Sequence, residues 1–410
     1  MIYMKTKRTV AKIASVFLAG IMILGFAGCK EKKAAIDTTP NPESDFEFIL
    51  NDDMTKVSIT KYKGTRADLV IPETIQGIPV TAIISQETGS YDLMGGYSLK
   101  SILDTDIRSL VIPSSVEYIG ESAFANTDYP GHTRFLQLID IKGCTYIGKN
   151  AFEGAGRNLK SWDLKELKKF GYLGKLNVTV NFPENLGFID QEAFYNANIE
   201  EVNLEKCKNL KSIKALAFSG SETKQSANYE NEAIKKVILP EGLLYIGDGA
   251  FEGDKNLSEI NFPSTLKMIE RNAFRGNSSL TKVTLNEGLE ILGENAFRYC
   301  TGLKSVSIPS SLKFVRVDRI TYDFGQFENC DSLEEIILPD NIDTVKYLMY
   351  KNNDTILEYK FRGKSPESLS KIFSGKSIDS SISLQKLLKA DIQEATAEEY
   401  EAMNTLKKSL

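Results

Sequence analysis

The central part of the chain repeats itself every 23 residues, and this period limits the folds open to it. Pro240, Pro263 and Pro309 occupy the same position in three units, and Asn286 takes that position in the unit between the last two. A fixed period of this length is typical of a solenoid, whose units are too small to bury an apolar face alone and pack against their neighbours. Solenoids present extended binding surfaces, so the period favours a binding scaffold over an enzyme.

Each unit opens with a segment that alternates like a half-buried β-strand. Apolar residues at alternate positions place one face inward, and a proline at the end stops the strand because it has no amide proton for the ladder. The template is apolar-x-x-apolar-x-apolar, and it occurs at residues 107–112, 199–204, 234–239, 257–262, 280–285, 303–308 and 333–338. Stacked units of this kind predict a parallel sheet.

The rest of each unit returns the chain to the next strand. Leu243 and Ile246 follow Pro240, and the pair Ala250-Phe251 closes that unit. We interpret the Gly-x-x-Ala-Phe stretch as one helical turn that carries the phenylalanine into the core. The same pair stands at 123–124, 151–152, 193–194, 217–218, 273–274 and 296–297, and one further unit without it is expected between residues 164 and 180. The predicted fold is a leucine-rich-repeat-like solenoid with short parallel strands and a helical turn in each coil.

These units resemble the BspA-type leucine-rich repeats of bacterial surface proteins. The matching features are the strand template ending in proline, the Ile-Gly-x-x-Ala-Phe segment and a cysteine or asparagine after it, and they cover about residues 45–340. The segment 46–80 resembles the N-terminal cap of that family. The resemblance implies a cell-surface binding or adhesion role, in some members attachment to host matrix proteins, and it implies no catalytic residue.

The first 29 residues have the form of an export signal. Lys5, Lys7, Arg8 and Lys12 precede an uncharged, mostly apolar run, and small residues lead to Cys29. The end of this run resembles a bacterial lipobox, with Phe26 where leucine is usual, so we expect lipidation of Cys29 and a membrane anchor. An uncleaved anchor and ordinary secretion are the alternatives, and all three place the protein outside the cytoplasm.

The chain divides into five expected parts. They are the lipoprotein signal 1–29, a polar, flexible tether 30–44, an N-terminal cap with the first repeats 45–106, the solenoid 107–340 and a C-terminal cap with helices 341–410. In the last part Leu384, Leu387, Leu388 and Ile392 have helical spacing. A helix that caps the stack and a separate helix that binds a partner both fit this pattern.

The residue types needed for most catalytic and metal sites are scarce. His132 is the only histidine and stands in a turn-rich insertion, where we expect it to be exposed. A single histidine excludes most catalytic mechanisms that pair histidine with serine or cysteine, and it excludes the common zinc sites. We therefore predict no catalytic residue, metal or cofactor. The net charge of −5, without a basic stripe, argues against nucleic acid as a partner. Acidic pairs such as Glu200-Glu201 could suggest the carboxylates of a glycosidase. They fall at outward strand positions, so we interpret them as part of a solvated, charged face.

The cysteines other than Cys29 lie in the repeats. Cys144 replaces an apolar residue and is expected in the core, and Cys207 lies in extra residues before Leu210. Cys300 and Cys330 occupy equivalent positions in successive units, which would bring them within reach of a disulfide if the units stack in register. In the family that this chain resembles, this position often holds a cysteine that forms no disulfide, and both states stay open.

Insertions interrupt the period at residues 85–97, 127–134, 219–232 and 316–325. Loops added to a rigid repeat often carry recognition, although neutral drift also produces them. Tyrosine is enriched where proteins contact partners, and these insertions contain the candidate binding residues Tyr91, Tyr97, Tyr129, Tyr229 and Tyr322.

The sequence therefore predicts a lipid-anchored cell-surface scaffold that mediates protein–protein or adhesion contacts. Its partner would be a host or bacterial surface protein or a glycan. An envelope-associated carbohydrate-active or other hydrolase and a purely structural spacer are the competing hypotheses.

Overall fold

The structure is a computed structural model of the whole chain. It describes residues 35–91, 97–126, 132–157, 177–220, 233–312, 314–315, 326–327, 329–333, 335–338, 358–361 and 405.

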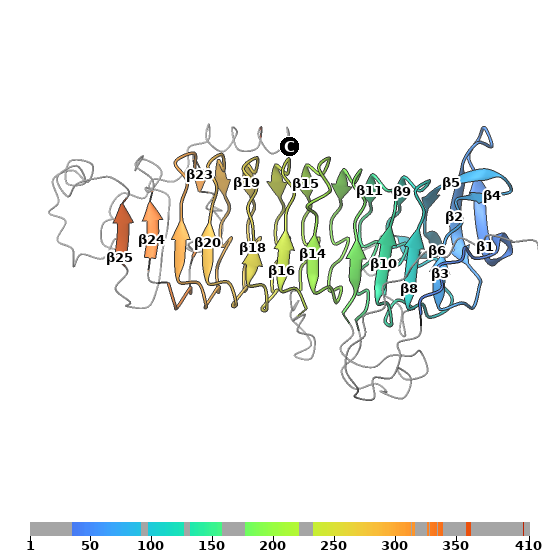
Figure 1. Cartoon of the computed structure of the whole chain (residues 1–410), viewed down its shortest axis with the longest axis horizontal. Coiled ribbons are helices and arrows are strands. Elements are labelled where there is room, and N and C mark those ends of the chain that lie inside the picture. Colours follow the sequence, from blue (N-terminus) through green and yellow to red (C-terminus); the bar gives the residue numbers. More distant parts are fainter. Residues whose placement is uncertain are drawn as a thin grey trace, which may run out of the picture.

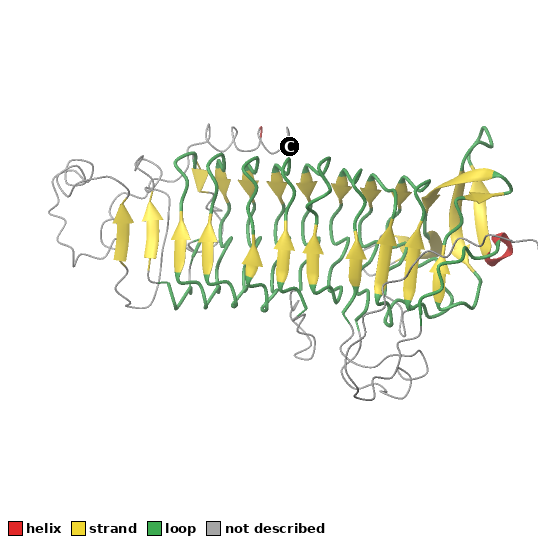
Figure 2. Ribbon diagram, in the orientation of Figure 1, coloured by secondary structure: helices red, strands yellow, loops and turns green. Residues whose placement is uncertain are grey.

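Two rows of parallel strands face each other along the length of the molecule (Figures 1 and 2), and the apolar core lies between them. One row consists of the longer strands and includes a strand at each of the seven segments predicted by the strand template. Its members are β3 (Asp68–Val70), β8 (Ser109–Ile112), β10 (Leu138–Ile141), β12 (Thr179–Asn181), β14 (Glu201–Asn203), β16 (Lys236–Ile238), β18 (Glu259–Ile260), β20 (Lys282–Thr284), β22 (Ser305–Ser307), β24 (Glu335–Leu338) and β25 (Glu358–Phe361). The predicted solenoid with a parallel sheet is confirmed.

The second row is a continuous sheet of two-residue strands, which the sequence did not predict. Its parallel members are β9 (Tyr118–Ile119), β11 (Tyr146–Ile147), β13 (Phe188–Ile189), β15 (Ser212–Ile213), β17 (Tyr245–Ile246), β19 (Met268–Ile269), β21 (Ile291–Leu292) and β23 (Phe314–Val315). In each strand from β9 to β21 the second residue is buried in the core. The first residue therefore points to the outer face, because successive side chains of a strand alternate.

The phenylalanines of the Ala-Phe pairs form one row inside the stack. The rings of Phe251 and Phe274 stack at 5.4 Å, and those of Phe274 and Phe297 at 5.3 Å. The row runs through Phe124, Phe152, Phe194, Phe218, Phe251, Phe274, Phe297 and Phe327, each of which is buried. Every coil therefore buries its aromatic ring against the rings of its neighbours, as the repeat requires.

The turn that holds each Ala-Phe pair is not helical, which corrects the predicted helical turn. The residue before the alanine has a positive φ of 55–61° in seven coils, whereas a right-handed helix needs a negative φ. These residues are Ser122, Asn150, Glu192, Leu216, Gly249, Asn272 and Asn295. The left-handed residue reverses the chain so that the phenylalanine enters the core from a tight turn.

No coil lies between residues 157 and 177 in the stack, contrary to the further unit expected there. Strand β10 pairs directly with β12, and β11 pairs directly with β13. Phe152 also stacks directly on Phe194, at 5.1 Å. Residues 158–176 lie outside the described residues.

The N-terminal end of the stack has its own arrangement. Strand β1 (Phe46–Leu50) pairs antiparallel with β2 (Val57–Tyr62) and forms the edge of the short-strand sheet, and β2 pairs with β5 (Ile78–Ile83). Strand β4 (Thr74–Ile75) pairs with β5, and β6 (Gln86–Tyr91) forms a hairpin with β7 (Tyr97–Lys100). A register shift between Glu47 and Phe48 interrupts the edge strand, a device that discourages pairing with another chain.

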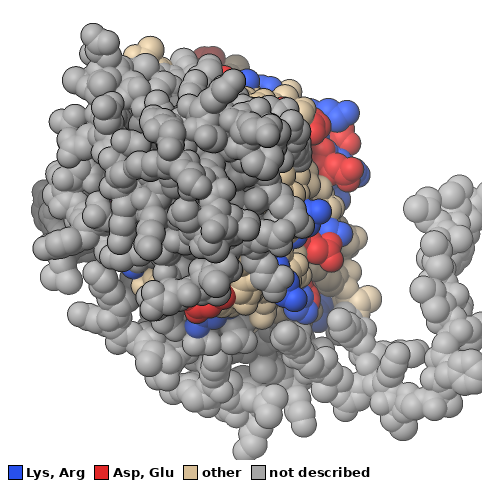
Figure 3. Space-filling model, turned by 90° about the vertical axis from the view of Figure 1, so that its left-hand side faces the viewer, with Lys and Arg blue, Asp and Glu red and all other residues tan. Residues whose placement is uncertain are grey.

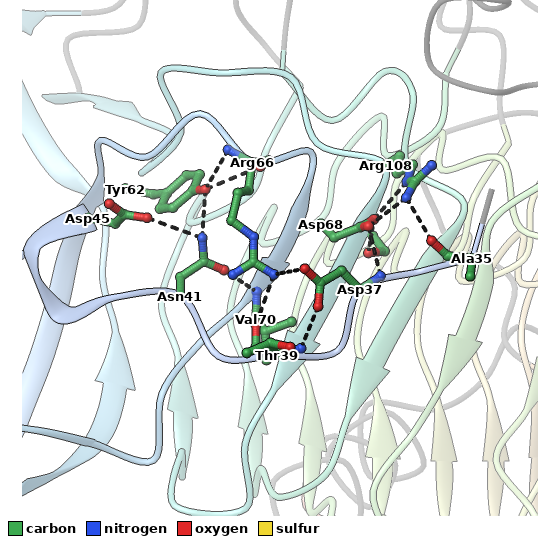
Figure 4. A network of polar contacts seen from close by, with 11 residues as sticks. Ala35, Asp37, Thr39, Asn41, Asp45, Tyr62, Arg66, Asp68, Val70 and Arg108 are labelled. Carbon is green, nitrogen blue, oxygen red and sulfur yellow. Dashed lines mark hydrogen bonds and ion pairs between the residues drawn. The ribbon is translucent and has the colours of Figure 1, made fainter.

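Residues 35–44, which the sequence assigned to a flexible tether, lie against the first coils instead (Figure 4). The backbone N–H of Asn41 donates to the carbonyl of Val70 at 2.9 Å, and the Asn41 Oδ1 accepts from the Val70 N–H at 2.9 Å. Val70 belongs to β3, the end strand of its sheet. We call residues 35–44 the strap, because they cover the open edge of that sheet.

Asp68 is the centre of the contacts that hold the strap. It accepts hydrogen bonds from the Asp37 N–H at 2.9 Å and from Arg108 at 2.8 and 2.6 Å (Figure 4). Arg108 also donates to the carbonyl of Ala35, and Arg66 pairs with Asp37 at 2.7 Å. Hydrogen bonds thus order this polar segment without burial of apolar side chains, which is why its composition suggested flexibility.

The C-terminal part is described only in short pieces. Strand β25 pairs with β24, so the parallel row continues past residue 340, where the solenoid was expected to end. The predicted C-terminal helix with Leu384, Leu387, Leu388 and Ile392 lies outside the described residues. Within the described part of the chain, no helix has the length and apolarity needed to cross a membrane.

Candidate functional site

The insertions leave the stack at more than one place. The turn that holds each Ala-Phe pair is here called the phenylalanine turn. The insertions at 127–134 and 219–232 both begin at the end of such a turn, near Asn126 and Gly220, and precede the next long strand. We call the side of the stack on which the chain leaves these turns the turn edge. The insertion at 316–325 instead follows β23 and precedes Phe327, and the one at 85–97 contains the hairpin of β6 and β7. The four insertions therefore do not all leave the stack on the same side.

The structure brings two of the predicted tyrosines together. Tyr91 and Tyr97 are partners across the hairpin of β6 and β7. Tyr129, Tyr229 and Tyr322 lie outside the described residues, as does Cys29. Their roles stay predictions.

Tyr299 on the turn edge was missed by the sequence analysis. Its side chain is 37% exposed, and the guanidinium carbon of Arg298 lies 4.6 Å from its ring centroid. Arg298 also donates to the Tyr299 hydroxyl at 3.1 Å. Its φ of 61° places Tyr299 where Gly253 and Gly276 stand in the two preceding coils. A tyrosine at a position that favours glycine was the signal available in the sequence.

The outer face of the long-strand row carries paired charges. Glu201 pairs in register with Lys236, and Lys236 with Glu259, whose carboxylate lies 3.6 Å from the lysine Nζ. Glu200 makes an ion pair with Lys235. In the view of Figure 3, acidic and basic side chains lie beside one another on the described surface. The solvated face predicted for the acidic pair Glu200-Glu201 is therefore confirmed, and lysines of the neighbouring coil lie beside these carboxylates.

His132 is half-buried, which corrects the expectation that it would be exposed. Its Nδ1 lies 3.2 Å from the Oδ1 of Asp106, and Arg134 pairs with the other carboxylate oxygen at 2.8 Å. Burial raises the pKa of Asp106, but the bonds from His132 and Arg134 outweigh it and lower the pKa overall. This contact fixes the insertion to the coil before it.

The cysteines in the repeats are buried thiols, with no disulfide among them. Cys144 lies in the core as predicted, and Cys207 approaches the carbonyl of Pro183 at 3.3 Å. Cys300 and Cys330 lie in neighbouring coils and donate to the carbonyls of Phe274 and Phe297. Burial raises the pKa of the Cys300 thiol, so its thiolate is disfavoured.

The same interior position holds a carboxyl group two coils before Cys300. Asp254 is fully buried, and its burial raises its pKa well above the ordinary value. Asn277 follows it in the next coil and is equally buried. Asp254 and Asn277 are buried inside the stack, so a substrate cannot reach them. Among the described residues, no group of three histidine, cysteine or acidic side chains is placed to hold a metal ion.

Comparison with known proteins identifies the repeat. A profile described as the BspA type leucine rich repeat region matches the chain in six copies, over residues 99–225, 222–357 and 320–396. No curated protein matches the chain.

Several solved structures are similar to it. A leucine-rich cell surface protein from Faecalibacterium prausnitzii shares 18% identity, with 77% of this chain and 99% of that chain covered and a TM-score of 0.25. A leucine-rich repeat protein from Bacteroides ovatus shares 17% over 80% of this chain and 79% of that chain, with a TM-score of 0.34. The pneumococcal vaccine antigen PcpA shares 17% over 80% of each chain, with a TM-score of 0.33.

Proposed function

The chain belongs to the BspA type leucine-rich repeat family, and we propose that it is a cell-surface scaffold that binds a macromolecule. In this proposal, export is directed by residues 1–29, and a lipid on Cys29 holds the protein at the membrane. The partner is a surface protein or a glycan of a host or of another bacterium. Contact is made through side chains on the outside of the stack, with a few aromatic and charged residues supplying most of the affinity.

The rigid repetition of the coils is the observation that carries this proposal. From β9 to β23 every short strand pairs in register with the next, so the outer residues stand in a fixed row. A rigid frame of this kind presents loops at constant positions, and binding residues are commonly found on such loops. Two of the insertions begin after Asn126 and Gly220, both on the turn edge.

The pairing of the outer charges favours binding over hydrolysis. A glycosidase needs two carboxyl groups that flank a bound substrate, whereas Glu200 and Glu259 each face a lysine of a neighbouring coil. The hydrolase hypothesis therefore has less support than the scaffold.

The strap supports the proposed anchoring. It begins at Ala35, six residues after Cys29, and is held to the N-terminal coils by Asp68 and Arg108. A lipid on Cys29 would hold the N-terminal end of the stack close to the membrane surface, with the remaining coils extending from it.

The proposal is tested with the exported chain, residues 30–410, on arrays of matrix proteins and glycans. We expect saturable binding to a member of one array, and weaker binding when residues 221–232 are replaced by a short glycine-containing turn. A matched variant with the same turn in place of residues 158–176 shows whether the effect is specific to one insertion. Absence of binding on both arrays contradicts the proposal. Turnover of a glycosidase or peptidase substrate that is lost with one carboxylate substitution would establish the hydrolase.

A further inference from the structure

Three aromatic side chains stand side by side on the outer face of the short-strand sheet. Tyr118, Tyr146 and Phe188 are the first residues of β9, β11 and β13 and are partners in register. The rings of Tyr118 and Tyr146 stack at 5.1 Å and 17°, and those of Tyr146 and Phe188 lie 6.2 Å apart at 44°. Tyr118 is 40% exposed and Phe188 47%. We call these three residues the aromatic platform.

The platform is the open part of a longer column of outward residues, in which Ser212 of β15 stands between Phe188 and Tyr245. Further along the same sheet, Tyr245, Met268 and Ile291 occupy the equivalent outward positions, yet they are only 7%, 2% and 1% exposed. Large apolar side chains left open beside a covered stretch of the same surface are typical of an interaction site. A partner that contacts this column therefore has access at the platform.

Carboxylates surround the platform. The Tyr146 hydroxyl donates to the Oδ2 of Asp190, and Asp190 also accepts from the Gln191 N–H at 2.8 Å. Within the described ranges, no cation pairs with Asp190. Glu121 pairs with Lys149 at 3.5 Å, and both side chains are about half exposed. Burial raises the pKa of Tyr118, and the negative charges of Glu121 and Asp190 raise it further.

Elsewhere the protein covers its outward rings with its own cations. In the same column, the Nζ of Lys214 lies 5.3 Å from the ring centroid of Tyr245. On the turn edge, Arg275 and Arg298 both lie over Tyr299. As far as the described residues go, no lysine or arginine lies over Tyr118 or Phe188. The platform therefore combines exposed rings with the carboxylate of Asp190. Both an exposed ring face and a carboxylate attract a cation.

We propose that the aromatic platform and Asp190 form a docking surface for a basic segment of a partner polypeptide. This inference rests on the proposed binding function and names the chemistry of the partner. Lysine or arginine side chains contact the outer ring faces of Tyr118 and Phe188, and one of them pairs with Asp190. A glycan is the alternative occupant, and the array experiment described below distinguishes it from a basic polypeptide.

The experiment uses residues 30–410 and a fluorescein-labelled decapeptide of alternating arginine and glycine, followed by fluorescence anisotropy. A peptide of alternating glutamate and glycine is the charge-reversed probe. We expect the basic peptide to bind and the acidic peptide not to bind. Tyr118→Ala and Asp190→Asn should each weaken binding roughly two- to five-fold, the effect expected for one exposed cation–π contact or ion pair.

Three controls separate the platform from the rest of the surface. Tyr118→Phe keeps a ring and should bind like the parent chain, and Tyr299→Ala removes an exposed tyrosine on the turn edge and should have no effect. An unchanged thermal midpoint in each variant shows that the fold is intact. Equal binding of both peptides, or an equal loss with Tyr299→Ala, overturns the proposal.

The array experiment provides an independent outcome. A protein partner whose binding survives Tyr118→Ala and Phe188→Ala supports the scaffold function but overturns the docking surface. A glycan whose binding is lost in these variants, with no effect on the basic peptide, also overturns it and assigns the platform to carbohydrate.

Discussion

The rings of Phe251 and Phe274 lie 5.4 Å apart and only 3° from parallel, although 22 residues separate them in the chain. This contact recurs between every pair of neighbouring phenylalanine turns that the structure describes. The core is therefore a single row in which each ring depends on the coils on both sides. Stability, and with it the placement of the outer surfaces, follows from this row.

Removing one ring from the row should destabilise the whole stack. Phe274→Ala deletes a fully buried ring, and we expect the free energy of unfolding to fall by about 3–5 kcal/mol. Urea denaturation followed by circular dichroism measures the change. Phe188→Ala is the matched control, since the same substitution at a half-exposed ring should cost about 1 kcal/mol or less. Equal losses in the two variants would contradict the assignment of Phe274 to the core.

A better residue for the turn conformation should stabilise the protein. Glu192 has a φ of 57°, which asparagine adopts more readily than glutamate. We expect Glu192→Asn to raise the free energy of unfolding by about 1 kcal/mol. Gln191→Asn changes the adjacent residue, which has no positive φ, and should be neutral. An increase of the same size in both variants would show that the backbone conformation is not the cause.

The strap should make stability depend on the ionisation of Asp68. Burial raises the pKa of Asp68, but hydrogen bonds from Arg108, the Asp37 N–H and Ser109 lower it overall. A lowered folded-state pKa stabilises the protein above the unfolded pKa of about 3.9, and this contribution is lost as the pH falls through the folded-state pKa. We expect Asp68→Asn to cost about 2 kcal/mol at pH 7 and much less near pH 2.

Urea denaturation at the two pH values measures this difference. Asp104→Asn is the control, because Asp104 pairs with Lys61 at a more exposed site and should cost about 1 kcal/mol or less. A cost for Asp68→Asn that does not change with pH would refute the role of its carboxylate. Faster proteolysis within residues 35–44 should accompany the loss of stability.

Lipid anchoring predicts a specific chemical change at Cys29. In a bacterial host, the parent chain should incorporate a labelled fatty acid and remain in the membrane fraction. Cys29→Ser should abolish the label and release the protein, because no thiol is left to carry the lipid. Incorporation of label in the Cys29→Ser variant would rule out the proposed site.

The sequence predicted those features of the fold that the repeat encodes directly. The spacing of Phe251, Phe274 and Phe297 was enough to place them in one row, and the register of Glu201, Lys236 and Glu259 followed from the strand template. Both depend on periodic positions, which stay recognisable when other residues vary.

Features without a periodic signal were missed. A two-residue strand such as Tyr245–Ile246 is too short to show alternation, so the second sheet was not recognised. The left-handed turns were taken for helical turns because glutamate and leucine, which favour helices, precede the alanine in some coils. At Glu192 and Leu216 that residue nevertheless has a positive φ. The strap was missed because hydrogen bonds to Asn41 and Asp68 order it, and composition does not reveal such partners.

The candidate binding residues show the same limit. The tyrosines were chosen because they lie in insertions, whereas Tyr118, Tyr146 and Phe188 lie within regular coils. Their importance depends on exposure and on neighbours such as Asp190, which become adjacent only when the coils stack.

A distance between two distant coils tests the stacked architecture most directly. Glu117 and Lys267 precede Tyr118 and Met268, which are five strand steps apart in the short-strand sheet, so about 24 Å should separate them at ~4.8 Å per step. Spin labels on Glu117→Cys and Lys267→Cys are read by pulsed electron paramagnetic resonance, in a chain that starts at residue 30 and whose native cysteines are buried. The account predicts one narrow distance peak near this value. A much longer distance, or a broad distribution without such a peak, would contradict it.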